Sequence, residues 1–468
     1  MKTDFNIATS LLQLINSEQA HHYNIIPVEA QNGTLKFRSD NTTGALKQEL
    51  QIVLGKDIEL IEDTTENIQN YLAVNFRKGI LNESDDLHYS SDFLEKLLLT
   101  AKEIGSSDIH FEPYEHKCRV RFRLDGKLKE QFIIALSEYP VIVNKLKIKA
   151  GLDISEKRLP QDGRISVNTT NNEFDIRVSS LPTLHGEKIV LRILSKDANH
   201  IELEDLGFTA RELKIYKETI KKPNGIVLIS GPTGSGKTTT LYATLKLLND
   251  NKTNILTIED PIEYTLEGVN QVQLKENIGL DFASTLRTFL RQDPDIIMVG
   301  EIRDVKTANM AIRAALTGHL VLSTIHTNSA WATVSRLIDM GIPAFLIAST
   351  LNVSVAQRLV RMLCEHCKKK IPIVEATFPE HFKTPNGLET HYKADGCNQC
   401  HHTGYNGRKA IYEIIPITKS LVGHIKNNDL EIDDYLSEYN IVTLRHNAIA
   451  LVQQGITSIE EVYPLLTE

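Results

Sequence analysis

Long apolar runs are missing from this sequence. Nowhere do roughly eighteen apolar residues follow one another, so we expect no helix that spans a bilayer. The N-terminal stretch MKTDFNIATSLLQLINSEQA has one lysine, a following aspartate and no long apolar core, which argues against a signal or transit peptide. Excess positive charge is missing too, since the net charge is −8. We therefore expect a cytoplasmic protein, unless something docks it to a membrane, with no nucleic-acid partner.

The composition is that of an ordinary folded protein. Hydrophobic residues make up 41% of the 468 positions and charged residues 24%. This length exceeds one domain, and the patterning predicts three. We place an N-terminal domain at 1–82, a second domain at 88–200 and a third at 205–468, with a polar linker, LNESDDLHYSSD, at 81–92.

The first two predicted domains show short strand and helix patterns. Residues 5–15 carry a helical apolar stripe. Residues 118–130, CRVRFRLDGKLKE, alternate apolar and basic residues and then turn at Asp125-Gly126, which predicts a hairpin. Residues 173–180 alternate in the same way and carry Arg177 outward, whereas 188–195 is interpreted as a more buried strand that includes Arg192. The patterns of the second domain favour an α+β fold with an antiparallel sheet.

A phosphate-binding loop follows a buried strand. The apolar run GIVLIS at 225–230 leads into GPTGSGKTTT, which matches G-x-x-x-x-G-K-[ST]. Glycines let backbone N–H groups approach phosphate oxygens, the lysine reaches the β- and γ-phosphates, and the threonine hydroxyl ligates Mg²⁺. The predicted ATP-binding residues are Gly231, Pro232, Thr233, Gly234, Ser235, Gly236, Lys237, Thr238 and Thr239.

Acidic residues follow two further predicted strands. The run at 296–299 ends in Gly300-Glu301, and a carboxylate there is placed to hold Mg²⁺ together with Thr238. The run at 254–260 is followed by Glu263, with Glu259 and Asp260 at its end. A carboxylate at that place can orient or deprotonate the attacking water.

Four of the five cysteines form two C-x-x-C pairs. Cys364 and Cys367 make the first pair, Cys397 and Cys400 the second, and together they offer four thiolates to one tetrahedral zinc ion. Two alternatives stay open at this point. The string CNQCH also fits a haem-attachment pattern, and either pair could be a redox pair.

Several strings resemble the ATPases of type II secretion systems and type IV pili. The resemblance runs from about Gly105 to Ile414. It rests on GSSDIHFEP, RLPQDGR, GPTGSGKTTT, TIEDPIEY, RQDPDIIMVGEIRD and TGHLVLSTIHTN. It implies a RecA-like α/β motor domain with a structural zinc insert at about 362–408, preceded by a PAS-like α+β domain and a small N-terminal α+β domain.

The resemblance also implies roles for single residues. Glu263 would activate water, Glu301 would serve Mg²⁺ and the γ-phosphate, and His319 and His326 would sense the γ-phosphate and couple domains. Arg177 and Arg192 would reach the phosphates from the second domain. A second arginine pair, Arg287 and Arg291, would lie within the motor domain.

The function implied by the resemblance is a homo-hexameric ATPase that assembles pilin or pseudopilin subunits. Its cofactors would be ATP, Mg²⁺ and Zn²⁺. Its partners would be an inner-membrane platform protein and a membrane docking protein that contacts the N-terminal domain. The alternatives are a pilus retraction motor, a nucleic-acid translocase of the same superfamily and a ring member that does not hydrolyse ATP. Intact Lys237, Thr238, Glu263 and Glu301 argue against the last of these.

Overall fold

The computed structural model describes residues 7, 11, 14, 15, 17–31, 34–76, 93–168, 173–194, 201–373, 378, 379, 382, 388–429 and 431–467. The chain divides into two compact units, which are Met1–Ile165 with Arg177–Arg192, and Ser166–Ile176 with Ile193–Glu468. The predicted linker at 81–92 and most of the predicted helix at 5–15 lie outside the described residues. Within the described part of the chain, no helix is long and apolar enough to cross a bilayer.

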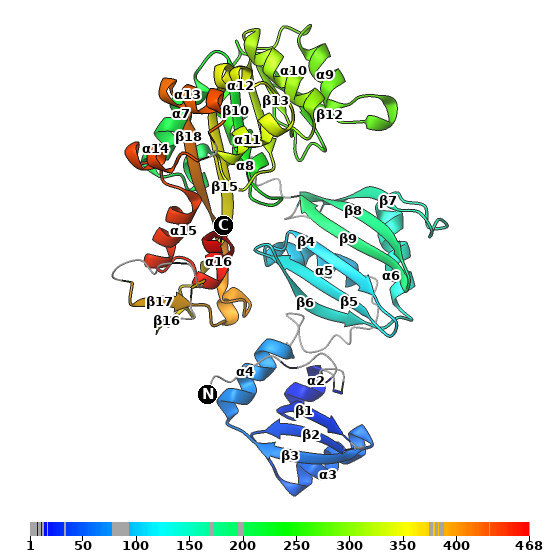
Figure 1. Ribbon diagram of the computed structural model, residues 1–468. Helices are drawn as coiled ribbons and strands as arrows, with labels where there is room; N and C mark the ends of the chain where they lie inside the picture. Colours follow the sequence, from blue (N-terminus) through cyan, green and yellow to red (C-terminus); the bar gives the residue numbers. More distant parts are fainter. Residues whose placement is uncertain are drawn as a thin grey trace. The chain divides into compact units, whose positions relative to one another are not determined.

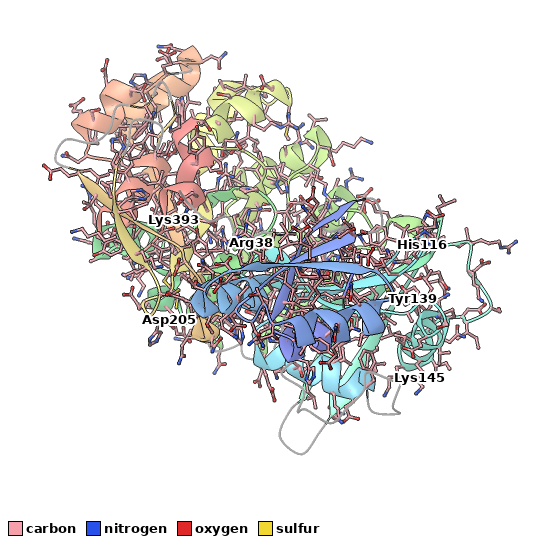
Figure 2. The ribbon with its side chains drawn as sticks, turned by 90° about the horizontal axis from the view of Figure 1, so that it is seen from below. Arg38, His116, Tyr139, Lys145, Asp205 and Lys393 are labelled. Atoms are coloured by element: carbon pink, nitrogen blue, oxygen red, sulfur yellow. The ribbon has the colours of Figure 1, made fainter. Side chains whose placement is uncertain are left out.

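The N-terminal part of the first unit is a small three-stranded sheet with helices (Figure 1). Strand β2 pairs with β1 in the antiparallel sense and with β3 in the parallel sense. Fully buried Phe37 and Ile68 belong to its own hydrophobic core, and Arg38, labelled in Figure 2, pairs with Asp63 at 3.0 Å. Its elements are α2 (Ser17–His22), β1 (Ile25–Gln31), β2 (Thr34–Ser39), α3 (Gly44–Leu54), β3 (Asp57–Glu62) and α4 (Thr65–Asn75).

A six-stranded sheet in the order β6-β5-β4-β9-β8-β7 follows. Asp125 and Gly126 have positive φ angles of 46° and 84°, which is the backbone that a tight two-residue hairpin turn requires. The predicted hairpin is therefore confirmed. Its elements are α5 (Phe93–Glu103), β4 (Asp108–Pro113), β5 (Cys118–Leu124), β6 (Lys127–Ile134), α6 (Tyr139–Lys149), β7 (Gln161–Asn168), β8 (Glu173–Thr183) and β9 (Gly186–Leu194).

One face of this sheet packs against helix α6. Lys147 of α6, which is fully buried, pairs with Glu187 of β9 at 2.5 Å. Ser180 of β8 donates its hydroxyl to the same carboxylate at 2.8 Å. Tyr139, labelled in Figure 2, donates to the Glu187 carbonyl oxygen. Because side chains alternate along a strand, Arg177 and Arg192 lie on the opposite face of the sheet from Ser180 and Glu187.

The second unit contains a seven-stranded sheet in the order β12-β11-β13-β14-β10-β15-β18. All neighbouring strands are parallel except β15 and β18. Strand β10 is completely buried, as its unbroken apolar run predicts for a central parallel strand. Two hydrophobic clusters share the strand, one containing Ile226 and Leu228 and the other Val227 and Ile229, so both faces of the sheet are covered (Figure 1).

Helices and strands alternate through the first part of this unit, and a long hairpin with further helices makes up the second part. The first part contains η2 (Leu203–Leu206), α7 (Ala210–Ile220), β10 (Gly225–Ser230), α8 (Lys237–Leu248), β11 (Ile255–Glu259), β12 (Val269–Gln273), η3 (Glu276–Ile278), α9 (Phe282–Phe289), β13 (Ile296–Val299), α10 (Val305–Leu316) and β14 (Leu320–Ile325). The second part contains α11 (Ala332–Asp339), α12 (Ala344–Thr350), β15 (Leu351–Leu363), β16 (Lys369–Pro372), β17 (Thr390–Lys393), η5 (Asn398–Cys400), β18 (Tyr405–Pro416), α13 (Lys419–Asn427), α14 (Asp433–Glu438), α15 (Leu444–Gln453) and α16 (Ile459–Thr467).

Strands β15 and β18 form the long hairpin, which carries the four paired cysteines. The pairing extends from Val353↔Pro416 to Leu363↔Tyr405, well past the end of β10. The first cysteine pair follows β15 directly and the second precedes β18. The hairpin therefore brings the two pairs to one place, although residues 368–396 separate them in the sequence.

Candidate nucleotide and metal sites

Two glycines of the phosphate loop, Gly231 and Gly236, lie against the neighbouring strand β15. Gly231 has a φ of +145°, and a Cβ there would lie 2.4 Å from the carbonyl oxygen of Gln357 in β15. Gly236 has a φ of +86°, and its Cβ would lie 2.9 Å from the Gln357 side-chain nitrogen. Any other residue would therefore strain the backbone at both positions, and at Gly231 it would also collide with the backbone of β15. The loop ends where α8 begins, so the N-terminus of this helix faces the space above the loop.

Polar groups at the loop fit a phosphate. The buried Ser235 hydroxyl has no hydrogen-bond partner among the described residues, an orphaned donor that a phosphate oxygen would satisfy. The Lys237 ammonium donates to the carbonyl oxygens of Gly231 at 2.8 Å and Pro232 at 3.0 Å. Burial lowers the pKa of Lys237, the Glu301 carboxylate acts to raise it, and Arg358 adds a further lowering effect. The remaining loop residues, Thr233, Gly234, Thr238 and Thr239, are exposed or half-buried.

Glu301 lies at the same edge of the sheet as the phosphate loop. Strand β14 separates β13 from β10, and its register aligns the ends of all three strands. The Glu301 carboxylate lies 3.2 Å from Nε2 of His326 and also pairs with Arg303. Thr324 donates its hydroxyl to the Gly300 carbonyl oxygen at 2.8 Å, which fixes the turn that carries Glu301. The structure thus brings Lys237, Glu301 and His326 to one edge.

His319 does not lie at this edge. It precedes β14, whereas His326 follows it, and Leu320 of β14 pairs with Gly225 at the start of β10. At about 3.3 Å per residue, the strand places the two histidines about 20 Å apart. The ring of His319 is instead 2.8 Å from the Ala314 carbonyl oxygen, at the end of α10. The expectation that both histidines sense the γ-phosphate is therefore wrong for His319.

The acidic residues at and after the end of β11 have separate environments. Glu259 is buried, and its carboxylate accepts hydrogen bonds from Tyr242, from Thr257 at 2.5 Å and from Gln271 at 3.1 Å. With its carboxylate bonded to these three donors, Glu259 has a structural role. Glu263 is half-buried, and its backbone N–H donates to the Tyr242 hydroxyl at 3.4 Å. Since Tyr242 belongs to α8, the helix that follows the phosphate loop also holds the segment that carries Glu263.

Arg287 and Arg291 lie at the end of α9 and are both exposed. Arg291 donates to the Arg287 carbonyl oxygen at 3.0 Å and weakly to the Thr288 hydroxyl at 3.4 Å. These bonds hold the Arg291 side chain along the surface of its own helix. No hydrogen bond within the described part of the second unit joins either side chain to the phosphate loop.

Arg177 and Arg192 belong to the six-stranded sheet of the first unit. Arg177 is half-buried on β8. The Nε atom of Arg192 lies 2.9 Å from Oδ1 of Asp108, and the Arg192 side chain is 55% exposed. The interpretation of 188–195 as a buried strand is thus wrong near its end: the strand alternates, and Arg192 occupies an outward position. Because the Arg192 side chain is exposed and paired with Asp108, its place on this strand does not bury an unpaired charge.

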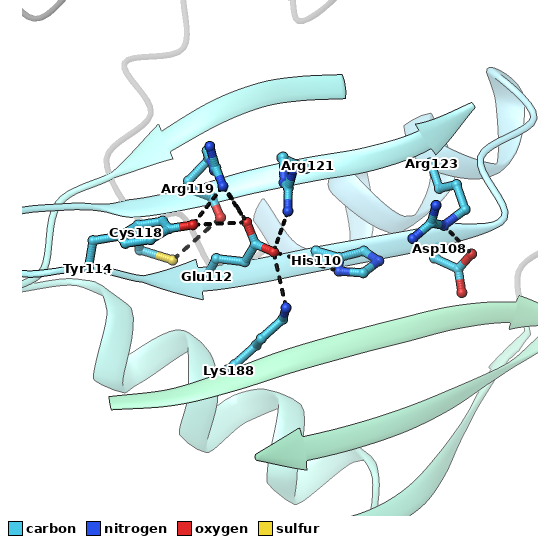
Figure 3. A network of polar contacts seen from close by, with 9 residues as sticks. All are labelled: Asp108, His110, Glu112, Tyr114, Cys118, Arg119, Arg121, Arg123 and Lys188. Carbon is cyan, nitrogen blue, oxygen red and sulfur yellow. Dashed lines mark hydrogen bonds and ion pairs between the residues drawn. The ribbon is translucent and has the colours of Figure 1, made fainter. Parts of the chain in front are cut away.

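The outward face around Arg192 is strongly basic. Figure 3 shows Arg123 beside Asp108, with 3.2 Å between Nε and Oδ2, and Glu112 surrounded by cations. Burial raises the pKa of Glu112, but bonds from Arg121, Lys188 and Arg119 outweigh it and lower that pKa to about 2. The cations of this network outnumber its carboxylates, which leaves a positive face suited to an anion.

The four paired cysteines converge on one point. Their sulfur atoms lie within 4.8 Å of one another, and three of the pairs are 3.8 Å apart. Four thiolates placed tetrahedrally at about 2.3 Å from a zinc ion would be about 3.8 Å apart, whereas a disulfide needs about 2.05 Å. Convergence of all four favours one metal over a haem attachment or separate redox pairs.

Backbone N–H groups donate to two sulfur atoms of this cluster, and at Cys400 they favour the thiolate. Burial raises the pKa of Cys400, but N–H groups of Cys397 and Gly404, each 3.2 Å from the sulfur, reverse this and lower it to about 7. Gly396 donates to Cys367 at 3.3 Å, but burial outweighs this bond and raises the pKa of Cys367 to about 12. The fifth cysteine, Cys118, is buried in β5, and burial raises the pKa of its thiol to about 12, so it is an inert thiol.

We expect about one equivalent of zinc per chain after purification without added metal under reducing conditions. Cys400→Ser should lose most of it and melt at a lower temperature, because a structural metal stabilises the fold that binds it. Cys118→Ser is the matched control and should keep the full equivalent. Elemental analysis decides: folded wild-type protein without zinc would refute the site.

Two structural supports of the nucleotide site have no signature in the sequence. Tyr242 ties the segment of Glu263 to α8, and Gln357 fills the space beside the phosphate loop and accepts a hydrogen bond from Thr240 at 2.9 Å. A tyrosine within a helix and a glutamine within a strand carry no local signal of either task. Only the placement of β15 beside β10 reveals the second.

Comparison with known proteins identifies close relatives. The family model described as "Type II/IV secretion system protein" matches residues 83–464. The chain is 46% identical over 415 residues to the type IV pilus assembly ATPase PilB of Myxococcus xanthus, covering 87% of this chain and 72% of that protein. It is 45% identical over 395 residues to the type II secretion system protein E of Pseudomonas aeruginosa, covering 82% and 78%.

Solved structures share the fold. The pilus retraction motor PilT with bound ADP superposes with a TM-score of 0.55 at 27% identity, covering 79% of this chain and 95% of that one. The Legionella pneumophila ATPase DotB superposes with a TM-score of 0.61 at 21% identity, covering 82% and 98%. The mixed α/β fold described above is therefore that of secretion and pilus ATPases.

Proposed function

The chain belongs to the type II/IV secretion system protein family, and from this premise we propose that it is a motor ATPase that drives assembly of pilin or pseudopilin subunits. The observation that carries the proposal is the arrangement at one edge of the seven-stranded sheet. A glycine-built phosphate loop, Glu301 and His326 meet there in a chain whose relatives are named ATPases.

The proposed chemistry assigns each group a task. Backbone N–H groups of the loop, the Ser235 hydroxyl and Lys237 hold the phosphates of ATP. Thr238 and Glu301 would hold Mg²⁺, which supplies positive charge to the phosphates. Glu263 orients the attacking water and accepts its proton, since Glu259 is committed to three donors. His326, beside Glu301, contacts the γ-phosphate side of the site.

The finer architecture is also part of the proposal. The domain at 1–82 docks the motor to a membrane protein, the PAS-like domain at 88–200 supplies Arg177 and Arg192, and the RecA-like domain at 205–468 holds ATP. Arg287 and Arg291 form a second arginine pair of the motor domain. The insert at about 362–408 binds one structural zinc through its four cysteines, whose sulfur spacing supports the assignment.

We further propose a ring of six such chains. The ring works in the cytoplasm, docked peripherally at the inner membrane, where it acts on a platform protein. Nucleic acid is not a partner in this proposal, and the net charge of −8 supports that view.

A pilus retraction motor is the alternative within the same fold, because PilT superposes on most of the chain. Assembly is favoured because the relatives at 46% and 45% identity are a pilus assembly ATPase and a secretion protein E. A cellular test separates the two. Loss of the gene in the source organism should abolish surface pili or protein secretion, and wild-type chain but not Lys237→Ala should restore them. Surplus pili after the loss would instead indicate retraction.

A further inference from the structure

Arg358 lies beside the phosphate loop, on a strand that continues past it. Ser230, the last residue of β10, pairs with Ala356 of β15, so Arg358 lies two residues further along, level with the loop. Its Nη2 atom donates to Oδ1 of Asn328 at 3.3 Å. Asn328 follows β14, and β14 and β15 are the two neighbours of β10. The contact therefore crosses the end of β10, where the loop begins.

The backbone around Arg358 is held tightly. The carbonyl oxygen of Gln357 is the atom that a Cβ on Gly231 would meet at 2.4 Å, and the Gln357 side chain accepts a hydrogen bond from Thr240 at 2.9 Å. Leu359 packs in the hydrophobic cluster on the α8 side of the sheet. With both neighbours fixed, the position of Arg358 along the loop is defined by the fold.

Arg358 and Lys237 are two cations near the Glu301 carboxylate. The positive charge of Arg358 adds to burial in lowering the pKa of Lys237, and Glu301 opposes this. Glu301 itself is shared with Arg303 and His326. Two cations beside the loop repel each other, and each negative charge of a nucleotide phosphate relieves that repulsion.

We propose that Arg358 binds the terminal phosphate of ATP from within the same chain and reports its presence through Asn328 to the segment that carries His326. The inference rests on the proposed function, since it assumes ATP at the phosphate loop. A guanidinium suits the task because its planar fork can bond two phosphate oxygens. Without a γ-phosphate, Arg358 donates to Asn328, as in this structure. A bound γ-phosphate competes for the same guanidinium, so the segment after β14 senses whether that phosphate is present.

The test compares two nucleotides in the full chain with Mg²⁺. Arg358→Gln should weaken binding of a non-hydrolysable ATP analogue about tenfold or more, the range for one charged hydrogen bond, and change ADP binding less than about threefold. Arg358→Lys should recover part of the loss. Arg313→Gln is the control, because Arg313 is exposed near the end of α10, at the opposite edge of the sheet, and it should bind both nucleotides normally.

Calorimetry of the four proteins separates the outcomes. Equal losses of affinity for both nucleotides in Arg358→Gln would overturn the inference, because a residue that only stabilises the loop would affect ADP and the ATP analogue alike. Unchanged binding of both would overturn it as well. If Arg358→Gln fails to fold, Arg358→Lys decides, with selective loss of analogue binding supporting the inference and unaltered discrimination opposing it. A wild-type chain that binds neither nucleotide would instead refute the proposed function.

Discussion

Arg192→Ala is expected to lower the ATP turnover of the full chain about a thousandfold or more. An arginine that reaches the γ-phosphate neutralises charge that develops in the transition state, and loss of such a residue has effects of that size. The position of Arg192 allows its side chain to leave its present partner and reach a phosphate. It lies on the outward face of its sheet, and its partner Asp108 is shared with Arg123, so the carboxylate keeps a cation when Arg192 leaves.

Arg123→Ala is the matched control for Arg192→Ala. It removes an arginine from the same Asp108 carboxylate but no proposed phosphate contact, so turnover should stay within about threefold. Paired spin labels in the two compact units should show a distance that differs between ADP and a non-hydrolysable ATP analogue in wild type, and this difference should vanish in Arg192→Ala. Retained activity together with a retained distance change would make Arg192 a structural charge.

Glu263→Gln should bind ATP with nearly normal affinity and hydrolyse it at least about a hundredfold more slowly. The amide keeps the size of the side chain but cannot accept the proton of the attacking water, and general bases contribute about 10²–10⁴-fold. Steady-state phosphate release by the oligomeric variant, beside equilibrium ATP binding, measures both effects.

Two glutamates provide controls for Glu263→Gln. Glu267→Gln alters an exposed residue of the same segment and should keep wild-type turnover. Glu259→Gln replaces one of the two buried oxygens that accept these three hydrogen bonds with a donor, so it should mainly lower the melting temperature. If Glu263→Gln turns over normally, Glu301 becomes the candidate base.

Local chemistry explains which parts of the site the sequence could predict. The phosphate loop is a contiguous string between a buried strand and a helix, and the structure places Gly231–Gly236 between β10 and α8 as that string requires. Glu301 was predicted from a strand end, which is also a local property. The carboxyl ends of parallel strands meet at one edge, so such predictions hold without knowledge of strand order.

The positions of His319 and Arg192 depend on the direction of one strand and on the alternation of side chains along another. His319 and His326 occur seven positions apart in the sequence, yet β14 lies between them and carries them to opposite edges. Arg192 was interpreted as a charge within an apolar strand. In β9 the buried positions are Glu187, Ile189 and Leu191, which leaves Arg192 outward. In both cases the sequence indicates the residue type but not the end of the strand or the face of the sheet on which the residue lies.

Contacts between distant segments were beyond sequence reasoning. The spacing of the cysteine pairs indicated zinc, but their convergence depends on the β15–β18 hairpin. Arg358 and Gln357 matter because β15 lies next to β10, a neighbour relation between strands that are far apart in the chain. No pattern within either strand states that relation.

The central claim is that this chain hydrolyses ATP at its phosphate loop. Phosphate release by the purified full-length chain, measured with ATP in the presence and absence of Mg²⁺, tests it most directly. We predict Mg²⁺-dependent turnover in wild type that Lys237→Ala abolishes, because the ammonium that holds the β- and γ-phosphates is gone. An oligomeric wild-type chain that binds ATP but releases no more phosphate than Lys237→Ala would contradict the claim and leave a ring member without hydrolytic activity.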